Sequence, residues 1–342
     1  MTKNIIILTD YKGHFGSKHF DIPYRSGMDK SLLKAAFLKY NYEVKYIGLS
    51  EVKINDLDKD DCILYTSSED IGYSYKDYIE DKVLILEESG FNVLPKYRYL
   101  RANNNKVFME ELRRLLYADS GFFAQSFGTL EELIQIKNSL SFPLVLKVSE
   151  GASGEGVFLA KTYNDLVSLI KKHRSTFDLK LKLKDIVRTY KHRGYMQESQ
   201  TRKKFIIQPF IPELKHDWKI YIFYDEYYVF KRPIQKGRGI KASGGGYDNY
   251  YYGEKADVSD ALLNFAKNVF EKLNTPHCSI DIAFDGNTYY LIEFQCLYFG
   301  TAGILYSDGC FTNNEGKWQF VNSKKKIEDV YVESVVKFLK NQ

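Results

Sequence analysis

Residues 278–295, with the sequence CSIDIAFDGNTYYLIEFQ, form the stretch that decides the fold. Two runs rich in apolar and aromatic residues, 278–284 and 288–295, flank the tripeptide 285–287, Asp-Gly-Asn. Asp-Gly between two such runs is a strong turn signal, because both residues tolerate positive φ. The stretch therefore predicts an antiparallel β-hairpin.

Each predicted strand carries one carboxylate among apolar neighbours, Asp281 on the first and Glu293 on the second. A buried carboxylate is costly unless a cation or hydrogen bonds compensate its charge. Because Mg²⁺ is usually bound by one or two carboxylates plus phosphate oxygens and water, we predict that Asp281, Glu293 and the amide oxygen of Gln295 hold Mg²⁺. A solvent-facing strand, or acids paired with lysines, remains the alternative.

A second candidate site lies where a glycine-rich loop joins two predicted strands, 143–148 and 156–160. Backbone N–H groups of such a loop can cradle phosphates. The lysine precedes the loop and a strand follows it, which excludes a P-loop. The alternative is a mobile glycine hairpin. The candidate phosphate ligands are Lys106 at a predicted helix start, Lys147, Ser149, Ser153, Gly154 and Gly156.

Residues 207–213, with the sequence IQPFIPE, combine an apolar strand end with polar groups. Gln208, Phe210 and Ile211 suit a purine, and Glu213 suits the ribose hydroxyls. Further basic residues follow this segment, and with a glycine-rich stretch at 237–246 they could close on an anionic substrate. These basic residues are Lys219, Lys231, Arg232 and Arg238.

Taken in order, these segments resemble the ATP-grasp superfamily over about residues 1–305. The order and spacing of several individually weak signals carry the resemblance. The matching positions are the ATP lysines Lys106 and Lys147, the phosphate loop 149–156, the adenine linker 208–211, the ribose acid Glu213, the basic pair Lys231 and Arg232, and the magnesium set Asp281, Glu293 and Gln295.

The resemblance implies an α/β (α+β) chain with the ATP-grasp fold. An N-terminal Rossmann-like pre-ATP-grasp domain is expected at 1–100, in agreement with the alternation of strand-like and helix-like segments there. A small lobe with a basic insertion (171–204) is expected at 101–206, and a C-terminal lobe with the magnesium site at 207–342. The two α+β lobes would enclose an ATP cleft.

The resemblance also implies an ATP-dependent ligase that joins a carboxylate to an amine through an acylphosphate, with ATP and one or two Mg²⁺ ions, or Mn²⁺ in their place. Lys231, Arg232 and Arg238 would stabilise the acylphosphate, because catalysis of phosphoryl transfer rests on positioning and charge neutralisation. A small-molecule kinase on the same scaffold and a non-catalytic polyanion-binding module remain open alternatives.

Two positions depart from the family pattern. Gln295 stands where asparagine is usual, so its role as a direct metal ligand is less secure. Lys219 stands where arginine is common, and lysine offers a point charge without the bidentate fork of arginine.

Composition and charge limit the partners and binding sites that this chain is expected to have. A formal net charge of +5 from 49 basic and 44 acidic residues is a weak argument for an anionic partner. The four cysteines show no metal-binding spacing and are expected to be buried thiols. The chain opens on a predicted strand, with no apolar run long enough to span a membrane, so a cytoplasmic protein without a membrane partner is expected.

The insertion at 171–204 is rich in lysine and arginine. A solvated, partly helical lid is the favoured interpretation. A surface for an acidic polymer or nucleotide sugar is the second, and nucleic-acid binding is not expected because aromatic residues are sparse there. The acceptors are small-molecule carboxylates and amines, with sugars, amino acids and peptides all open. An amphipathic helix ends the chain and docks on the core or on a second subunit, which leaves the oligomeric state open.

Overall fold

The computed structural model of the 342-residue chain describes residues 3–18, 21–70, 72–118, 122–150, 156–234, 240, 242 and 244–342. The fold divides into two compact units. Unit 1 comprises Met1–Asn103, Leu214–Lys236 and Gly245–Gln342, and unit 2 comprises Asn104–Glu213 and Gly237–Gly244. The three-part division expected from the sequence stays a prediction.

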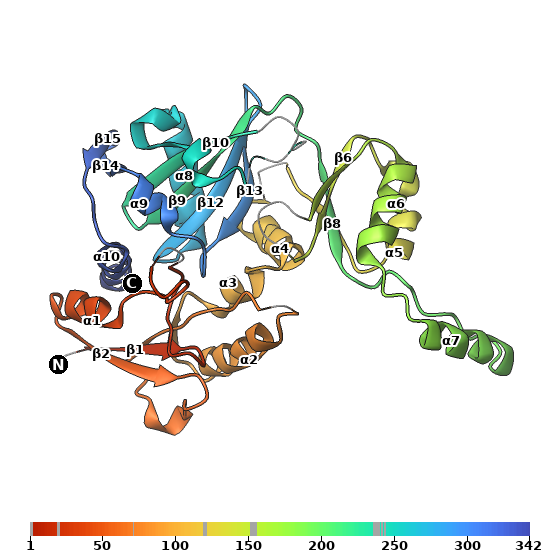
Figure 1. The fold of residues 1–342 in the computed structure, drawn as a ribbon, viewed down its shortest axis with the longest axis horizontal. Helices are drawn as coiled ribbons and strands as arrows, with labels where there is room; N and C mark the ends of the chain where they lie inside the picture. Colours follow the sequence, from red (N-terminus) through yellow and green to blue (C-terminus); the bar gives the residue numbers. More distant parts are fainter. Residues whose placement is uncertain are drawn as a thin grey trace. The chain divides into compact units, whose positions relative to one another are not determined.

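Unit 1 begins with a parallel four-stranded sheet, in the order β2-β1-β3-β4 (Figure 1). Along β1, Ile5 and Ile7 point into one apolar core, and Ile6 and Leu8 point into another. Both faces are therefore covered, as is usual for parallel sheets. The parallel sheet expected at 1–100 is confirmed, and its Rossmann-like class stays a prediction. Its elements are β1 (Lys3–Thr9), α1 (Lys30–Leu38), β2 (Tyr42–Gly48), β3 (Cys62–Leu64), α2 (Ser74–Glu88), β4 (Asn92–Leu94) and α3 (Tyr97–Ala102).

The second sheet of unit 1 has seven strands, in the order β13-β12-β9-β10-β14-β15, with β11 also paired to β10. The hairpin predicted at 278–295 is confirmed as β12 and β13, which pair antiparallel with a bulge after Asp281. The elements are β9 (His216–Phe223), β10 (Glu226–Pro233), β11 (Tyr251–Tyr252), α8 (Asp260–Leu273), β12 (His277–Phe284), β13 (Tyr289–Gln295), α9 (Ala302–Tyr306), β14 (Gly309–Asn314), β15 (Lys317–Asn322) and α10 (Ile327–Lys340).

The C-terminal helix α10 lies beside α1 and joins the two sheets of unit 1 (Figure 1). Its Val332, Val335 and Val336 share one core with Ile5 of β1 and with Phe223 of β9. The amphipathic helix expected at the chain end thus docks on the core of its own unit. Sequence analysis missed the hairpin β14–β15 that precedes it.

Unit 2 contains an antiparallel sheet in the order β5-β8-β6-β7. One face of this sheet packs on α5 and α6 through Leu146, Phe205 and Ile207. Thr129 caps the start of α5, since its hydroxyl accepts from the backbone N–H of Glu132 in a capping box. The elements are α4 (Lys106–Leu116), β5 (Gln125–Phe127), α5 (Leu130–Gln135), β6 (Leu144–Val148), β7 (Val157–Ala160), α6 (Tyr163–Arg174), α7 (Leu179–Lys191) and β8 (Phe205–Pro209).

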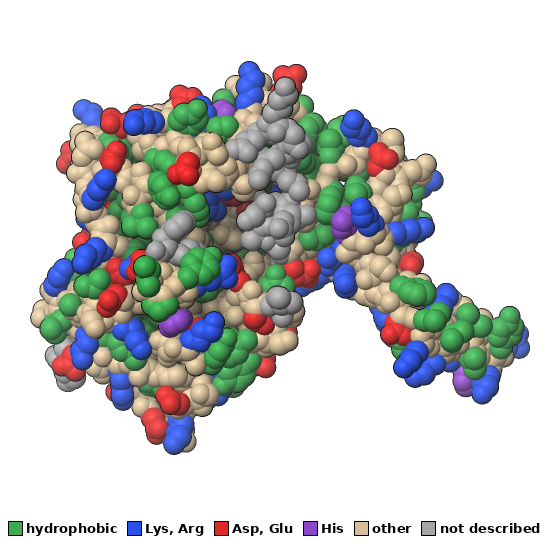
Figure 2. Space-filling model, in the orientation of Figure 1, with side chains coloured by type: hydrophobic (Ala, Val, Ile, Leu, Met, Phe, Trp, Pro, Cys, Tyr) green, Lys and Arg blue, Asp and Glu red, His purple; other side chains and the backbone are tan. Residues whose placement is uncertain are grey.

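The basic insertion at 171–204 begins with the end of α6 and contains the helix α7, which lies apart from α5 and α6 in unit 2 (Figure 1). Its apolar side chains are exposed, and Figure 2 shows them gathered on the visible face of the helix, with Lys and Arg at the edges. Among the described residues of α7, only Asp185 is buried.

The four cysteine thiols are buried, as expected. Across the part of the chain that the structure describes, the helices are too short or too polar to cross a membrane.

Candidate functional site

A cluster of opposite charges lies on one face of the seven-stranded sheet in unit 1. The register places Lys219 of β9 opposite Asp281 of β12, and Asp217 of β9 opposite Arg232 of β10. Lys219 Nζ lies 2.9 Å from Asp281 Oδ1, and Arg232 Nη2 lies 2.8 Å from Asp281 Oδ2. Arg232 also binds Asp217 in a bidentate pair, with both N–O distances at 2.7 Å. One guanidinium therefore joins two carboxylates from different strands.

Burial and neighbouring charge act in opposite directions on these groups. Burial alone would raise the pKa of Asp281, but the charges of Arg232 and Lys219 hold that pKa well below its usual value. Burial raises the pKa of Asp217, and the nearby Asp281 adds to this effect against the pull of Arg232. Burial opposes the charge on Arg232, yet the two carboxylates raise its pKa well above the usual value. Asp281 and Arg232 are thus a fixed anion and a fixed cation.

Glu293 lies directly opposite Asp281 in the β12–β13 pair. The amide of Gln295, two residues further along the same face, lies with its Nε2 3.5 Å from Glu293 Oε1. Carboxylate and amide oxygens are the ligands that Mg²⁺ prefers, so Glu293 and Gln295 fit a magnesium ion, whereas Asp281 would have to share its oxygens with Lys219 and Arg232. No group of three or more His, Cys, Asp or Glu side chains suited to a metal occurs among the described residues, but Mg²⁺ does not require one.

The structure corrects one step of the sequence argument for magnesium. That step took Mg²⁺ as the cation that compensates a buried Asp281, with acids paired to lysines as the alternative. Both oxygens of Asp281 are already paired with protein cations, Lys219 and Arg232. The burial of Asp281 therefore has a sufficient explanation within the chain, and the magnesium assignment stays a prediction that rests on the opposed Glu293 and on the family resemblance.

Lys231 does not join this cluster. Successive side chains of a strand point to opposite faces, so Lys231 of β10 points away from the face that carries Arg232. Its Nζ lies 2.9 Å from Asp257, an exposed carboxylate. Arg238, the third predicted basic residue, lies outside the described residues.

In unit 2, the predicted phosphate-binding residues Lys106 and Ser149 meet at the start of α4. The Lys106 backbone N–H donates to the Ser149 carbonyl oxygen at 3.0 Å. Asn105 caps α4 by accepting from the Phe108 N–H at 3.2 Å, and the Ser149 hydroxyl donates to the same Asn105 oxygen at 3.4 Å. Lys106 and Ser149 are both buried. The positive end of α4 is thus fixed at the end of β6.

Lys147 and Gln208 share the second face of the unit 2 sheet. Lys147 pairs with Ile206, and Val145 pairs with Gln208, so all four side chains lie opposite the apolar core on α5 and α6. Lys147 and Gln208 are both buried, and the Gln208 side-chain oxygen has no hydrogen-bond partner among the described residues. A buried acceptor without a partner is costly, and the amino group of a purine would satisfy it.

The remaining predicted ligands lie in the linker after β8 and in the glycine loop after β6. Ile211 is buried, Phe210 is partly buried, and Glu213 is exposed with a left-handed backbone (φ 56°). Gly156 opens the return strand, and a Cβ at this position would lie 2.0 Å from Val148 Cγ2, which explains the glycine. Ser153 and Gly154 lie outside the described residues.

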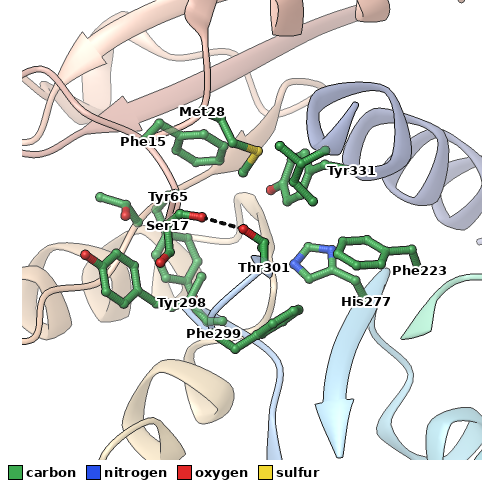
Figure 3. A pocket seen from close by; sticks show the side chains of 14 residues that line it. Phe15, Ser17, Met28, Tyr65, Phe223, His277, Tyr298, Phe299, Thr301 and Tyr331 are labelled. Atoms are coloured by element: carbon green, nitrogen blue, oxygen red, sulfur yellow. Dashed lines mark hydrogen bonds between the residues drawn. The ribbon is translucent and has the colours of Figure 1, made fainter. Parts of the chain in front are cut away.

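A pocket also opens within unit 1, between the loop after β1 and the segment after β13 (Figure 3). The Thr301 hydroxyl donates to the Ser17 carbonyl oxygen at 3.0 Å across it. The walls are mostly apolar and aromatic, with Phe15, Met28, Phe299 and Tyr331 among the side chains in view. Such walls suit an apolar group with few polar contacts.

His277 at the start of β12 lines this pocket and is only 4% exposed. Its ring stacks on Phe223 at 5.7 Å and lies 4.8 Å from the Tyr331 ring. Burial lowers the pKa of His277 to about 3, so the imidazole is neutral. Its Nδ1 has no hydrogen-bond partner in the part of the chain that the structure describes.

Sequence analysis gave no individual role to Asp217 or His277. Each belongs to the face marked by Asp281, since Asp217 precedes Lys219 by two residues and His277 precedes Asp281 by four. Period-two spacing was the signal that could have found them.

Comparisons with known proteins agree with this architecture. Residues 117–223 match the family model of the RimK-like ATP-grasp domain. No curated protein sequence matches the chain.

Several solved structures share the fold at low sequence identity. A RimK domain ATP-grasp protein from Sphaerobacter thermophilus DSM 20745 has 13% identity and a TM-score of 0.51, over 97% of this chain and 99% of that one. The D-cycloserine synthetase DcsG has 9% identity and a TM-score of 0.54, over 98% and 99%. The macrocyclase MdnC from Microcystis aeruginosa MRC, bound with the precursor peptide MdnA, has 11% identity and a TM-score of 0.52, over 98% and 99%. At these identities the likeness shows a shared fold and leaves the substrates open.

Proposed function

Because this chain has the ATP-grasp fold and carries a RimK-like ATP-grasp domain at residues 117–223, we propose that it is an ATP-dependent ligase that joins a carboxylate to an amine. The observation that carries the proposal is the charge cluster on β9, β10 and β12, together with Glu293 on the neighbouring strand β13. It presents opposed carboxylates, Asp281 and Glu293, beside a fixed guanidinium, Arg232. Phosphoryl transfer needs both a metal-binding oxygen set and a fixed cation.

In this proposal the nucleotide is bound by residues of unit 2. Lys106, Lys147 and Ser149 hold the phosphates together with the loop that ends at Gly156. Gln208, Phe210 and Ile211 hold the adenine, with the unpartnered Gln208 oxygen accepting from its amino group. Glu213 binds the ribose.

Residues of unit 1 act on the transferred group. Asp281, Glu293 and Gln295 would hold Mg²⁺, which neutralises phosphate charge when it is bound. Arg232 stays protonated because two carboxylates flank it, and its charge stabilises the phosphorylated acceptor. The acceptor carboxylate attacks the γ-phosphorus of ATP and releases ADP, and the amine then displaces phosphate from the acylphosphate. Lys219 and Arg238 remain predicted supports of this step, whereas Lys231 points to the other face of the sheet and is paired with Asp257.

The acceptor side of the proposal rests on the proteins of similar fold, because the pocket in Figure 3 has a volume of only about 40 Å³ and is too small for an amino acid or a ring. Among the proteins of similar fold, one is a D-cycloserine synthetase and one was solved with a precursor peptide, so amino-acid and peptide acceptors come first in the panel to test.

The experiment measures ADP and phosphate release with a panel of carboxylates and amines, and product mass by mass spectrometry. We expect ADP release to require both acceptors, with a product equal to their sum minus water. Glu293→Gln should lower kcat by about a hundredfold or more. Glu315→Gln, an exposed acid in the β14–β15 turn, is the matched control and should leave kcat unchanged.

Three outcomes would contradict parts of this proposal. Equal kcat for wild type and Glu293→Gln removes Glu293 from the metal set. A phosphorylated hydroxyl product with no amine incorporated favours the kinase alternative. ATP binding without turnover for any acceptor favours the non-catalytic alternative.

A further inference from the structure

The helix α7 has a continuous apolar face that the described residues of its unit leave exposed. Leu179, Leu183, Ile186, Val187 and Tyr190 follow the spacing of one helix face, and together they span an arc of about 100°. All five side chains are exposed, from 39% for Ile186 to 87% for Tyr190. Exposed apolar side chains on consecutive turns of one helix indicate an interaction surface.

One flank of α7 packs on its own chain. Asp185 accepts from the Tyr195 hydroxyl at 2.6 Å, and Lys182 Nζ donates to Gln197 at 2.8 Å. The Gln197 amide also donates to Thr189 at 3.2 Å. These contacts fix the helix on the returning segment and turn the apolar face outward, so the exposure is built into the fold.

Basic side chains border the apolar face. Residues 179–193 contain six Lys and Arg residues and a single acidic residue, Asp185. Asp185 is paired with Arg188 at 3.5 Å, and Lys180, Lys184 and Lys191 have no carboxylate within ion-pair distance among the described residues. This surface is therefore apolar at its centre and cationic along its margin, as Figure 2 shows.

We propose that α7 lies on the surface of an anionic phospholipid bilayer. Its apolar side chains insert at the headgroup level, and Lys180, Lys184 and Lys191 pair with lipid phosphates. A helix with apolar residues on one face and Lys and Arg beside them is typical of interfacial binding. The helix does not span the membrane, because its 13 residues cover only about 20 Å. This proposal is independent of the ligase activity.

Other occupants fit the same surface less well. A peptide helix binds in a groove with two walls, but α7 offers a convex face with no second element beside it among the described residues. A second copy of α7 would bring two strongly cationic helices together. A nucleic acid would satisfy the lysines and leave the leucines in water. An anionic bilayer satisfies both parts of the surface.

The proposal also revises the expectation that the chain has no membrane partner. That expectation rested on the lack of an apolar run long enough to span a bilayer, which says nothing about a helix lying in the interface.

The test is co-sedimentation of the full chain with lipid vesicles. Binding to vesicles of phosphatidylcholine and phosphatidylglycerol should be at least about tenfold tighter than to pure phosphatidylcholine, and should weaken as salt is added. Leu183→Glu should weaken binding by about tenfold or more, because it puts a charge at the centre of the apolar face. Ile134→Glu on α5, at a residue 48% exposed in the same unit, should have no effect.

A second pair of variants tests the charged margin. The double variant Lys180→Glu and Lys184→Glu should reduce binding by about tenfold or more, whereas Lys171→Glu with Lys172→Glu on the exposed side of α6 should change it little. Leu183→Trp should show a blue shift of tryptophan emission on addition of the anionic vesicles. A melting temperature equal to that of the wild type shows that a variant is folded.

Three results overturn the proposal. The first is the absence of binding to both vesicle types. The second is equal binding to both, which removes the role of the lysines. The third is binding to polyglutamate, but not to vesicles, that the Leu183→Glu substitution leaves unchanged. That result would show that α7 binds a soluble polyanion.

Discussion

Burial of His277 predicts a specific acid sensitivity of this protein. The folded state holds the imidazole neutral, with a pKa of about 3 against an ordinary value of 6.5. The unfolded chain therefore binds a proton that the folded chain rejects, and acid favours unfolding. The stability contributed by the neutral imidazole is fully present above the ordinary pKa and is lost as the pH falls toward the folded value.

The size of the effect follows from the two pKa values. Between about pH 8 and about pH 5, the free energy of unfolding should fall by about 2 kcal/mol from this residue alone. The matched variant is His277→Phe, because a phenyl ring can occupy the site formed by Phe223, Phe299 and Tyr331. This variant should lose stability at neutral pH through imperfect packing, but it should lose about 2 kcal/mol less than wild type on acidification.

The assay is urea unfolding of both proteins at a series of pH values between these limits. Other groups titrate in the same range, so the informative quantity is the difference between wild type and variant at each pH. His192→Gln, at an exposed histidine, is the control and should follow the wild-type curve. If the difference in free energy of unfolding between wild type and His277→Phe does not change with pH, the burial argument is refuted.

Three further variants test the packing of the candidate site and of unit 2. Arg232→Ala should lower the free energy of unfolding by about 3 kcal/mol in urea, because it removes the shared partner of two carboxylates that are only 15% and 14% exposed. A loss near zero would contradict the ion-pair geometry. Gly156→Ala should destabilise by about 1–3 kcal/mol through contact with Val148, and adding Val148→Ala should restore part of the loss; no restoration would place the strain elsewhere. Thr129→Ala should cost about 1 kcal/mol and lower the melting temperature through loss of the capping box, whereas Thr129→Ser should retain most of the stability.

The N-terminal parallel sheet, the 278–295 hairpin and the helix starts at Asn105, Thr129 and Ser259 could all be predicted from sequence. These features depend on local rules, namely turn residues, capping side chains and the period of apolar residues. The order of motifs from Lys106 to Glu293 also predicted the ATP-grasp fold. The hairpin β14–β15 escaped prediction because β14 does not alternate between apolar and polar residues and β15 is largely exposed.

The candidate site shows the limit of the same rules. Lys231 and Arg232 are neighbours in the sequence and were predicted to act as a basic pair. Because successive residues of a strand point to opposite faces of the sheet, their side chains lie apart. It identified Asp281 as a buried carboxylate in need of a cation, but the cations come from Lys219 and Arg232, 62 and 49 residues earlier in the chain.

Which residues carry charge, and on which local element each one lies, can thus be read from the amino-acid sequence. Which charges meet depends on the folded chain, because the strand register between β9, β10 and β12 sets the distances between them. The same holds for α7: its amphipathic pattern is present in the sequence, but the fold decided that Asp185 faces the returning chain and that the leucines face outward. Local propensity acts between near neighbours, whereas pairing across a sheet depends on the whole chain.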